Sequence, residues 1–188
     1  MVRAPGAGAP PGQPTFNNDV LVLGFNAGAK AEADSLSKRG NNVTLIRDSY
    51  AGNDKIAGSG AHKGKTFDLS TDAGVDQFAF SLGLPAAQTT EVAKVLKGVG
   101  PDARDEMGQL ARVWAGGEKG GKVPSRVVLS GHSGGSSLWG DDNGSVRYDQ
   151  VRDLAKAMPK AAAQVEDLHL AACYAGSQDN ADKFKEAF

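Results

Sequence analysis

Two short stretches of the sequence carry the residue types that nucleophilic hydrolysis needs. "VVLSGHSGG", residues 127–135, contains His132 and Ser133 in a glycine-rich loop, and "DLHLAACYAG", residues 167–176, contains Cys173, the single cysteine of the chain. A thiolate beside an imidazole base, with backbone N–H groups that hold an oxyanion, is one arrangement for acyl transfer. A serine hydroxyl activated by a histidine is another. The first question is therefore which residue attacks.

Residues 131–135 match the G-x-S-x-G pattern of serine hydrolases, in which Ser133 would be the nucleophile. That pattern works in a sharp turn from a strand into a helix, but Gly140 and the pair 143–144 (Asn-Gly) follow soon after and disfavour a helix start. A serine triad of this type also needs a later histidine, and only His169 follows, inside a predicted strand. A serine hydrolase is therefore the weaker alternative.

Cys173 fits the role of nucleophile better because of its place between the predicted elements. It follows an apolar stretch and precedes a glycine-containing turn ahead of a helix, where backbone N–H groups point outward. The loop at residues 133–135 can bring further backbone donors near His132, since glycine has no Cβ to obstruct them. The alternative is that this lone cysteine is a small buried hydrophobic residue.

Alternating strand and helix patterns predict the elements that must position these residues. Short apolar runs predict strands at 20–25, 42–47, 126–130 and 165–172, and helical patterns cover 29–39, 72–82, 85–96, 101–114, 148–158 and 180–188. This order favours an α/β fold with a mostly parallel sheet and helices on both faces. The segments 48–66 and 115–125 show no periodicity, and we predict loops there.

The predicted strands bring His132 and Cys173 to the same part of the fold. Each residue follows the end of a predicted strand, and these two strands are consecutive along the chain. Ligands of open parallel sheets bind beyond the carboxyl ends of the strands. If the two strands are neighbours in the sheet, the imidazole and the thiol emerge at one common edge.

The same features occur in a known order. An apolar strand leads into "GHSGG", then comes "GDDNGSVRYDQVRDLAKAM", and a second apolar strand ends in "AACYAG". This order resembles the caspase-like cysteine peptidases, the clan that includes metacaspases, legumain, clostripain and gingipains. Members carry a histidine closely followed by glycine after one strand and a cysteine, often in A-C-x-x-G or D-x-C-x-x-G, after the next, and residues 172–176 match the A-C-x-x-G form. The resemblance covers residues 127–177 well and the earlier part only in outline.

The resemblance implies a role for each residue of the site. Cys173 would be the nucleophile, His132 the general base and acid, and the backbone amides of Cys173 and of Ser133 or Gly134 the oxyanion donors. It also implies a three-layer sandwich over residues 19–188 that cleaves a protein or peptide substrate through a thioacyl intermediate. Neither a metal nor another cofactor takes part in such chemistry.

The sequence departs from the family pattern at two positions. Ser133 stands between His132 and Gly134, where most relatives have glycine directly after the histidine, and this changes which amide faces the oxyanion. Relatives that cleave after basic residues often have Asp two positions before the cysteine, but this chain has Ala171. The expectation of a basic side chain before the scissile bond is therefore weakened.

Several other residues are candidates for binding substrate. Asn26 and Asp48 close the first two predicted strands at the same edge and are candidates for lining a specificity pocket. Asp141 and Asp142 are candidates for selecting a basic side chain or binding calcium, as some relatives do, although a solvated D-D-N-G turn is the favoured interpretation. Trp139 is an aromatic residue in a predicted polar loop. It is a candidate platform or lid for the substrate, and the alternative is that it has no role in binding.

Composition excludes several classes of protein. Of the 188 residues, 40% are apolar and 23% are charged, as in globular domains, and no run reaches the ~18 to 20 apolar residues of a membrane span. The 21 basic and 22 acidic side chains give a net charge of -1 without a basic cluster, which argues against nucleic acid as a partner. A single cysteine excludes an internal disulfide, and no Cys/His pairs have the spacing of a structural zinc site.

The sequence also allows predictions for the two ends of the chain. Residues 1–18 are rich in proline and glycine and lack an apolar core, so we expect a flexible leader, not a Sec signal peptide, in a cytoplasmic protein or one exported by another route. The chain stops at Phe188, where relatives continue with further strands. This leaves open a fragment without its last strands that needs a second subunit or self-association, or a catalytically inactive caspase-like binding module.

Overall fold

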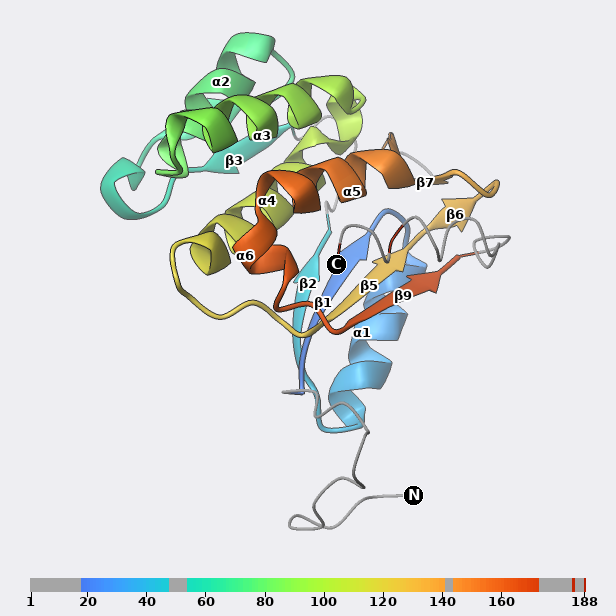
Figure 1. Ribbon diagram of the computed structural model, residues 1–188. Helices are drawn as coiled ribbons and strands as arrows, with labels where there is room; N and C mark the ends of the chain where they lie inside the picture. Colours follow the sequence, from blue (N-terminus) through green and yellow to red (C-terminus); the bar gives the residue numbers. More distant parts are fainter. Residues whose placement is uncertain (1–17, 48–53, 141–143, 173–183, 185–187) are drawn as a thin grey trace.

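The computed structural model describes residues 18–47, 54–140, 144–172, 184 and 188. A four-stranded sheet in the order β2-β1-β5-β9 lies at its centre (Figure 1). Its strands are β1 (Asp19–Gly24), β2 (Asn42–Ile46), β5 (Arg126–Ser130) and β9 (Asp167–Ala171). All three pairings are parallel, which confirms the predicted α/β fold.

Helices cover both faces of this sheet, as predicted (Figure 1). On one face α1 (Gly28–Lys38) packs against Val20, Val22 and Val128. The other face carries the larger core, which β1 and β5 share with the remaining helices. These are α2 (Asp72–Ser81), α3 (Ala86–Gly98), α4 (Arg104–Glu118), α5 (Tyr148–Ala157) and α6 (Pro159–Ala162). Because β1 and β5 are buried on both faces, their apolar runs are continuous.

Glycine sets both ends of the connection from β1 to β2. A Cβ on Gly24 would lie 2.1 Å from the Cβ of Ala29, so only glycine lets α1 pack this closely on the end of β1. Gly40 ends α1 with φ of 87°, a left-handed conformation that glycine adopts without strain. Its N–H donates to the carbonyl of Ser37 at 2.9 Å.

The prediction of a long loop at 48–66 is wrong for its described part. From residue 54 the chain forms the strand β3 (Lys55–Ala57), the 3₁₀ turn η1 (Gly60–His62) and the strand β4 (Thr66–Asp68), and the two strands pair antiparallel. Each strand buries one side chain, Ile56 or Phe67, which stand opposite each other. One apolar residue per strand gives too little periodicity to be recognised among glycines and lysines.

The loop predicted at 115–125 begins later than expected. The helix α4 follows the 3₁₀ turn η2 (Pro101–Ala103). It continues past residue 114, the predicted end, through Gly116 and Gly117 to Glu118. A Cβ on Gly117 would lie 2.2 Å from Val123 Cγ2, so close packing requires glycine here. The carboxylate of Glu118 accepts hydrogen bonds from the backbone N–H groups of Lys160 and Ala161 at 2.8 and 3.2 Å. These tertiary contacts outweigh the low helix propensity of glycine.

The polar loop expected after β5 is instead a small antiparallel sheet of three strands. These are β6 (His132–Ser133), β7 (Ser137–Trp139) and β8 (Ser145–Arg147), in the order β6-β7-β8. Leu138 and Val146 pair across β7 and β8 and are fully buried. They attach the small sheet to the large core.

The leader and the C-terminal helix predicted at 180–188 lie largely outside the described residues. Phe184 and Phe188 are described, and both pack on the main core: the Phe184 ring centroid lies 5.7 Å from that of Tyr148, and the Phe188 centroid 5.7 Å from that of Trp114. Across the described part of the chain, we find no helix with the length and apolarity needed to cross a lipid bilayer.

Candidate functional site

The strands that precede His132 and Cys173 are neighbours in the parallel sheet. β5 pairs with β9, and Ser130 at the end of β5 stands opposite Ala171 at the end of β9. The Gly131 N–H donates to the carbonyl of Ala171 at 3.5 Å, so the two strands are still in contact where they leave the sheet. This confirms the prediction that both strands end side by side at one edge. Cys173 itself lies outside the described residues, as do Asp48, Asp141 and Asp142.

His132 is an exposed residue on the outer face of the small sheet. It pairs with Trp139 on β7, which in turn pairs with Ser145 on β8. The centroids of the His132 and Trp139 rings are 6.4 Å apart, with the planes tilted by 40°. The imidazole is therefore accessible to a ligand and is held on a short strand at the carboxyl end of β5.

Ser133 points the opposite way from His132 because adjacent residues of a strand face opposite sides. It is buried, its Oγ lies 3.0 Å from the hydroxyl oxygen of Tyr148, and it accepts a hydrogen bond from the Gly135 N–H at 3.1 Å. The chain after Ser133 turns back into β7 and forms no helix. A buried, hydrogen-bonded hydroxyl in a hairpin lacks the exposure of a nucleophile elbow, which weighs against the serine alternative.

Tyr148 is a residue of this region that the sequence analysis missed. It begins α5, and burial raises the pKa of its hydroxyl, while the hydrogen bond with Ser133 acts in the opposite direction. The pair joins the inner face of the small sheet to α5. Each of the strands β7 and β8 buries a single apolar residue, so the sequence carries little signal for them or for their inner face.

Gly134 lies beneath the indole of Trp139. A Cβ on Gly134 would come within 3.3 Å of Trp139 Cη2 and 3.5 Å of Cζ3. The absence of a side chain at this position therefore lets the indole lie against the backbone that follows His132. The backbone of Ser133 and Gly134, predicted to supply an oxyanion donor, is thus directly beside both rings.

Asn26 reaches the same edge of the sheet from β1. The N–H of the preceding residue, Phe25, donates to the Ser130 carbonyl at 2.9 Å, so the chain after β1 runs beside the end of β5. The chain goes from β1 to β2 on one side, whereas β5 lies on the other, and such a switch point is where ligands of open α/β sheets bind. Asn26 Oδ1 is buried without a hydrogen-bond partner in the described part of the molecule. It is therefore an unsatisfied acceptor near this edge of the sheet.

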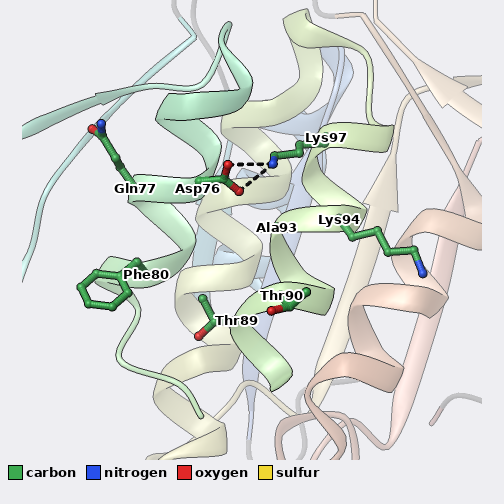
Figure 2. Close-up of a pocket in the computed structure, with 8 residues that line it drawn as sticks. All are labelled: Asp76, Gln77, Phe80, Thr89, Thr90, Ala93, Lys94 and Lys97. Atoms are coloured by element: carbon green, nitrogen blue, oxygen red, sulfur yellow. Dashed lines mark hydrogen bonds and ion pairs between the residues drawn. The ribbon is translucent and has the colours of Figure 1, made fainter. Parts of the chain in front are cut away.

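A separate groove of about 730 Å³ lies between α2 and α3 (Figure 2). Asp76 and Lys97 form an ion pair of 2.7 Å across it, and Phe80 at its rim is 75% exposed. The residues that line this groove belong to α2 and α3, and none belongs to β6, β7 or β8. None of the residues that line this groove was predicted to act in chemistry, so we treat it as distinct from the candidate site.

Metal ligands are not gathered at the described part of this edge. Among residues 18–47, 54–140 and 144–172, no three His, Cys, Asp or Glu side chains form a group that could hold a metal ion. The calcium site considered for Asp141 and Asp142 falls outside these residues.

No protein-family model, no curated protein and no solved structure matches this chain. The resemblance to the caspase-like peptidases therefore rests on the motifs around His132 and Cys173.

Proposed function

We propose that this protein is a caspase-like cysteine peptidase that hydrolyses peptide bonds with Cys173 as nucleophile and His132 as general base and acid. The observation that carries the proposal is the register of two adjacent strands, in which Ser130 stands opposite Ala171. His132 and Cys173 each follow these paired residues by two positions. Two residues that follow paired residues of adjacent parallel strands by the same number of positions leave the sheet at the same edge. This favours contact between the imidazole and the thiol.

The chemistry needs only groups of this chain and water. His132 takes the proton from Cys173 Sγ, and the thiolate attacks the carbonyl carbon of the scissile bond. Backbone N–H groups of Cys173 and of Ser133 or Gly134 stabilise the oxyanion. His132 then protonates the leaving amine as the C–N bond breaks and a thioester remains. Water, deprotonated by His132, hydrolyses the thioester and restores the free thiol.

The proposed setting follows from the same residues. We propose that the protein works in the cytoplasm, where thiols are kept reduced, or outside it after export without a Sec signal peptide. The substrate is a protein or peptide, because the exposed outer face of the small sheet offers the imidazole to an extended chain. A second subunit or a second copy of the chain that completes the cleft is compatible with this arrangement.

Alkylation of Cys173 by iodoacetamide at neutral pH tests the pairing of the thiol with the imidazole. We expect rapid alkylation of the parent protein and a rate at least about tenfold lower in His132→Ala, since an adjacent imidazolium lowers the pKa of a thiol. His169→Ala is the matched control, because His169 is an exposed histidine on β9. Its rate should equal that of the parent.

Cleavage of a peptide library tests the reaction itself. We expect cleavage by the parent, none by Cys173→Ala, and a loss of about 10²- to 10⁴-fold in His132→Ala. Slow alkylation that does not depend on His132, together with no cleavage, would indicate a catalytically inactive binding module. Cleavage that survives in Cys173→Ala but is lost in Ser133→Ala would indicate the serine hydrolase.

A further inference from the structure

The outer face of the small sheet presents an unusual side chain beside His132. Among the described residues, only Leu45, Phe80 and Trp139 are large apolar side chains with substantial exposure. Trp139 is 37% exposed and stands directly opposite His132 in the antiparallel pairing of β6 and β7. Phe80 lies in the separate groove, and Leu45 lies on the edge strand β2. Trp139 is thus the exposed aromatic residue that shares a surface with the proposed base.

The indole of Trp139 lies on strands that are anchored to the core and next to the backbone of Gly134. Leu138 and Val146, on the inner face of β7 and β8, are fully buried and fix these strands on the core. Gly134 lies next to the indole, because a Cβ at this position would come within 3.3 Å of Trp139 Cη2. The partner of Trp139 on β8 is Ser145, a residue with a small side chain. A rigid aromatic surface of this kind binds a flat or branched apolar group with little loss of conformational entropy.

Charged groups near the indole bear on which side chain it would bind. Arg147 lies on the same side of β8 as Ser145, and its Nε donates to the carboxylate of Asp149 at 2.9 Å. This pair is neutral in sum, whereas Asp102 of η2 lies against Gly144, just before β8, and adds a carboxylate nearby. His132 gains a positive charge when it takes the thiol proton, and a lysine or arginine side chain beside it would be repelled.

We propose that Trp139 is a specificity-determining residue that receives a large apolar side chain of the substrate, aromatic or branched aliphatic, next to the scissile bond. This inference rests on the proposed function, because it takes the imidazole beside the indole to be the base of a peptidase. The indole stacks on an aromatic side chain or packs against an aliphatic one. Ring pairs of this type contribute up to about a tenfold gain in affinity.

Peptide binding to the unreactive Cys173→Ala protein tests the inference without turnover. The peptides differ at one residue, which is Phe, Leu, Ala or Arg, and binding is followed by tryptophan fluorescence and by calorimetry. The chain has two tryptophans, and Trp114 is fully buried, so the signal that disappears in Trp139→Phe reports on Trp139. We expect the Phe and Leu peptides to bind about tenfold more tightly than the Ala peptide, and the Arg peptide to show no such gain.

Variants of Trp139 then assign this preference to the indole. In Trp139→Ala the preference for Phe and Leu over Ala should vanish, and in Trp139→Phe most of it should remain. Phe80→Ala is the matched control, since it removes an exposed aromatic side chain from the separate groove, and it should leave the preference unchanged. A preference that persists in Trp139→Ala, a preference for the Arg peptide, or no binding of any peptide would overturn the inference.

Kinetics of the parent separate this inference from the proposed function. If peptides bind with a preference that depends on Trp139 but the parent cleaves none of them, the inference stands as a binding site and the peptidase assignment fails. If Cys173-dependent cleavage occurs and Trp139→Ala keeps the parent ratio of kcat/KM between Phe and Ala peptides, the inference alone fails. We expect that ratio to fall about tenfold in Trp139→Ala, while the rate of alkylation of Cys173 stays at the parent value.

Discussion

The two sheets that meet at Gly131 use their side chains in opposite ways. In the parallel sheet, β1 and β5 bury side chains on both faces, so nearly every residue contributes to the core. In the small antiparallel sheet, Leu138 and Val146 are buried on one face, while His132 and Trp139 are exposed on the other. The first arrangement supplies stability, and the second leaves supported side chains exposed, where we propose that the substrate binds. Substitutions in the two sheets should therefore have different consequences.

The largest effect on stability is expected in the central strand β5. Leu129 is fully buried in the main core, and Leu129→Ala should lower the free energy of unfolding by about 2 to 5 kcal/mol through lost burial and a residual cavity. Urea denaturation followed by circular dichroism measures this. The matched control is Leu45→Ala on β2, where the side chain is 37% exposed and the loss should be smaller, about 0.5 kcal/mol. Equal losses would contradict the contrast between buried and exposed positions.

The same glycine substitution in both sheets gives a sharper comparison. In Gly24→Ala the new methyl group would lie 2.1 Å from Ala29 Cβ, so β1 and α1 must separate at a cost of about 1 to 3 kcal/mol. In Gly134→Ala the nearest atom is Trp139 Cη2 at 3.3 Å, on an exposed side chain that can move by a few tenths of an ångström. We expect little loss of stability there but a shift in Trp139 fluorescence. A larger loss in Gly134→Ala would show that the small sheet is as tightly packed as the core.

This contrast also explains which parts of the fold can be predicted from the sequence. The strands β1 and β5 are continuous apolar runs bounded by turn residues, and the parallel α/β fold follows from their alternation with helices. The placement of His132 and Cys173 after two consecutive strands predicted that these strands are neighbours, and the pairing of Ser130 with Ala171 confirms it. Strong local patterns thus define the framework and the edge where the candidate site lies.

The remaining parts depend on contacts between distant residues. The strands β3, β4, β7 and β8 each bury one side chain, so a window of sequence contains no periodicity that distinguishes them from polar loops. Likewise α4 passes through Gly116 and Gly117 because Val123 and the N–H groups of α6 receive its last turn. The pairing of Ser133 with Tyr148 follows from this tertiary packing, which explains why Tyr148 was not recognised as a residue of the site.

A smaller effect is expected on the inner face of the small sheet. Ser133→Ala removes the hydroxyl that binds Tyr148 and Gly135 and should lower the free energy of unfolding by about 1 kcal/mol. Tyr148→Phe should cost a similar amount, and the double variant less than the sum, because both remove one shared hydrogen bond. The control is Ser145→Ala on the exposed face, with no measurable change. Strict additivity in urea denaturation would show that the two hydroxyls do not interact.

The smallest effect is the pH dependence that Tyr148 contributes. Burial raises the pKa of its hydroxyl above the ordinary value near 10, so both folded and unfolded chains are protonated below that pH and the group contributes no slope. At higher pH the unfolded chain loses the proton first, the folded state binds more protons, and the free energy of unfolding falls until the pH passes the folded pKa.

Tyr148→Phe isolates this contribution, because the other two tyrosines of the chain are present in both proteins. The stability of the parent relative to Tyr148→Phe should be constant from about pH 7 to 9 and should decrease from about pH 9.5 to 11, measured by urea denaturation at matched ionic strength. A difference that stays constant over the upper range would mean that the hydroxyl is as well solvated in the folded protein as in the unfolded chain, and one that grows with pH would mean that folding favours its ionised form. The inner face of the small sheet would then be open to water. The small sheet would no longer have one buried and one exposed face, which is the property that distinguishes it from the parallel sheet.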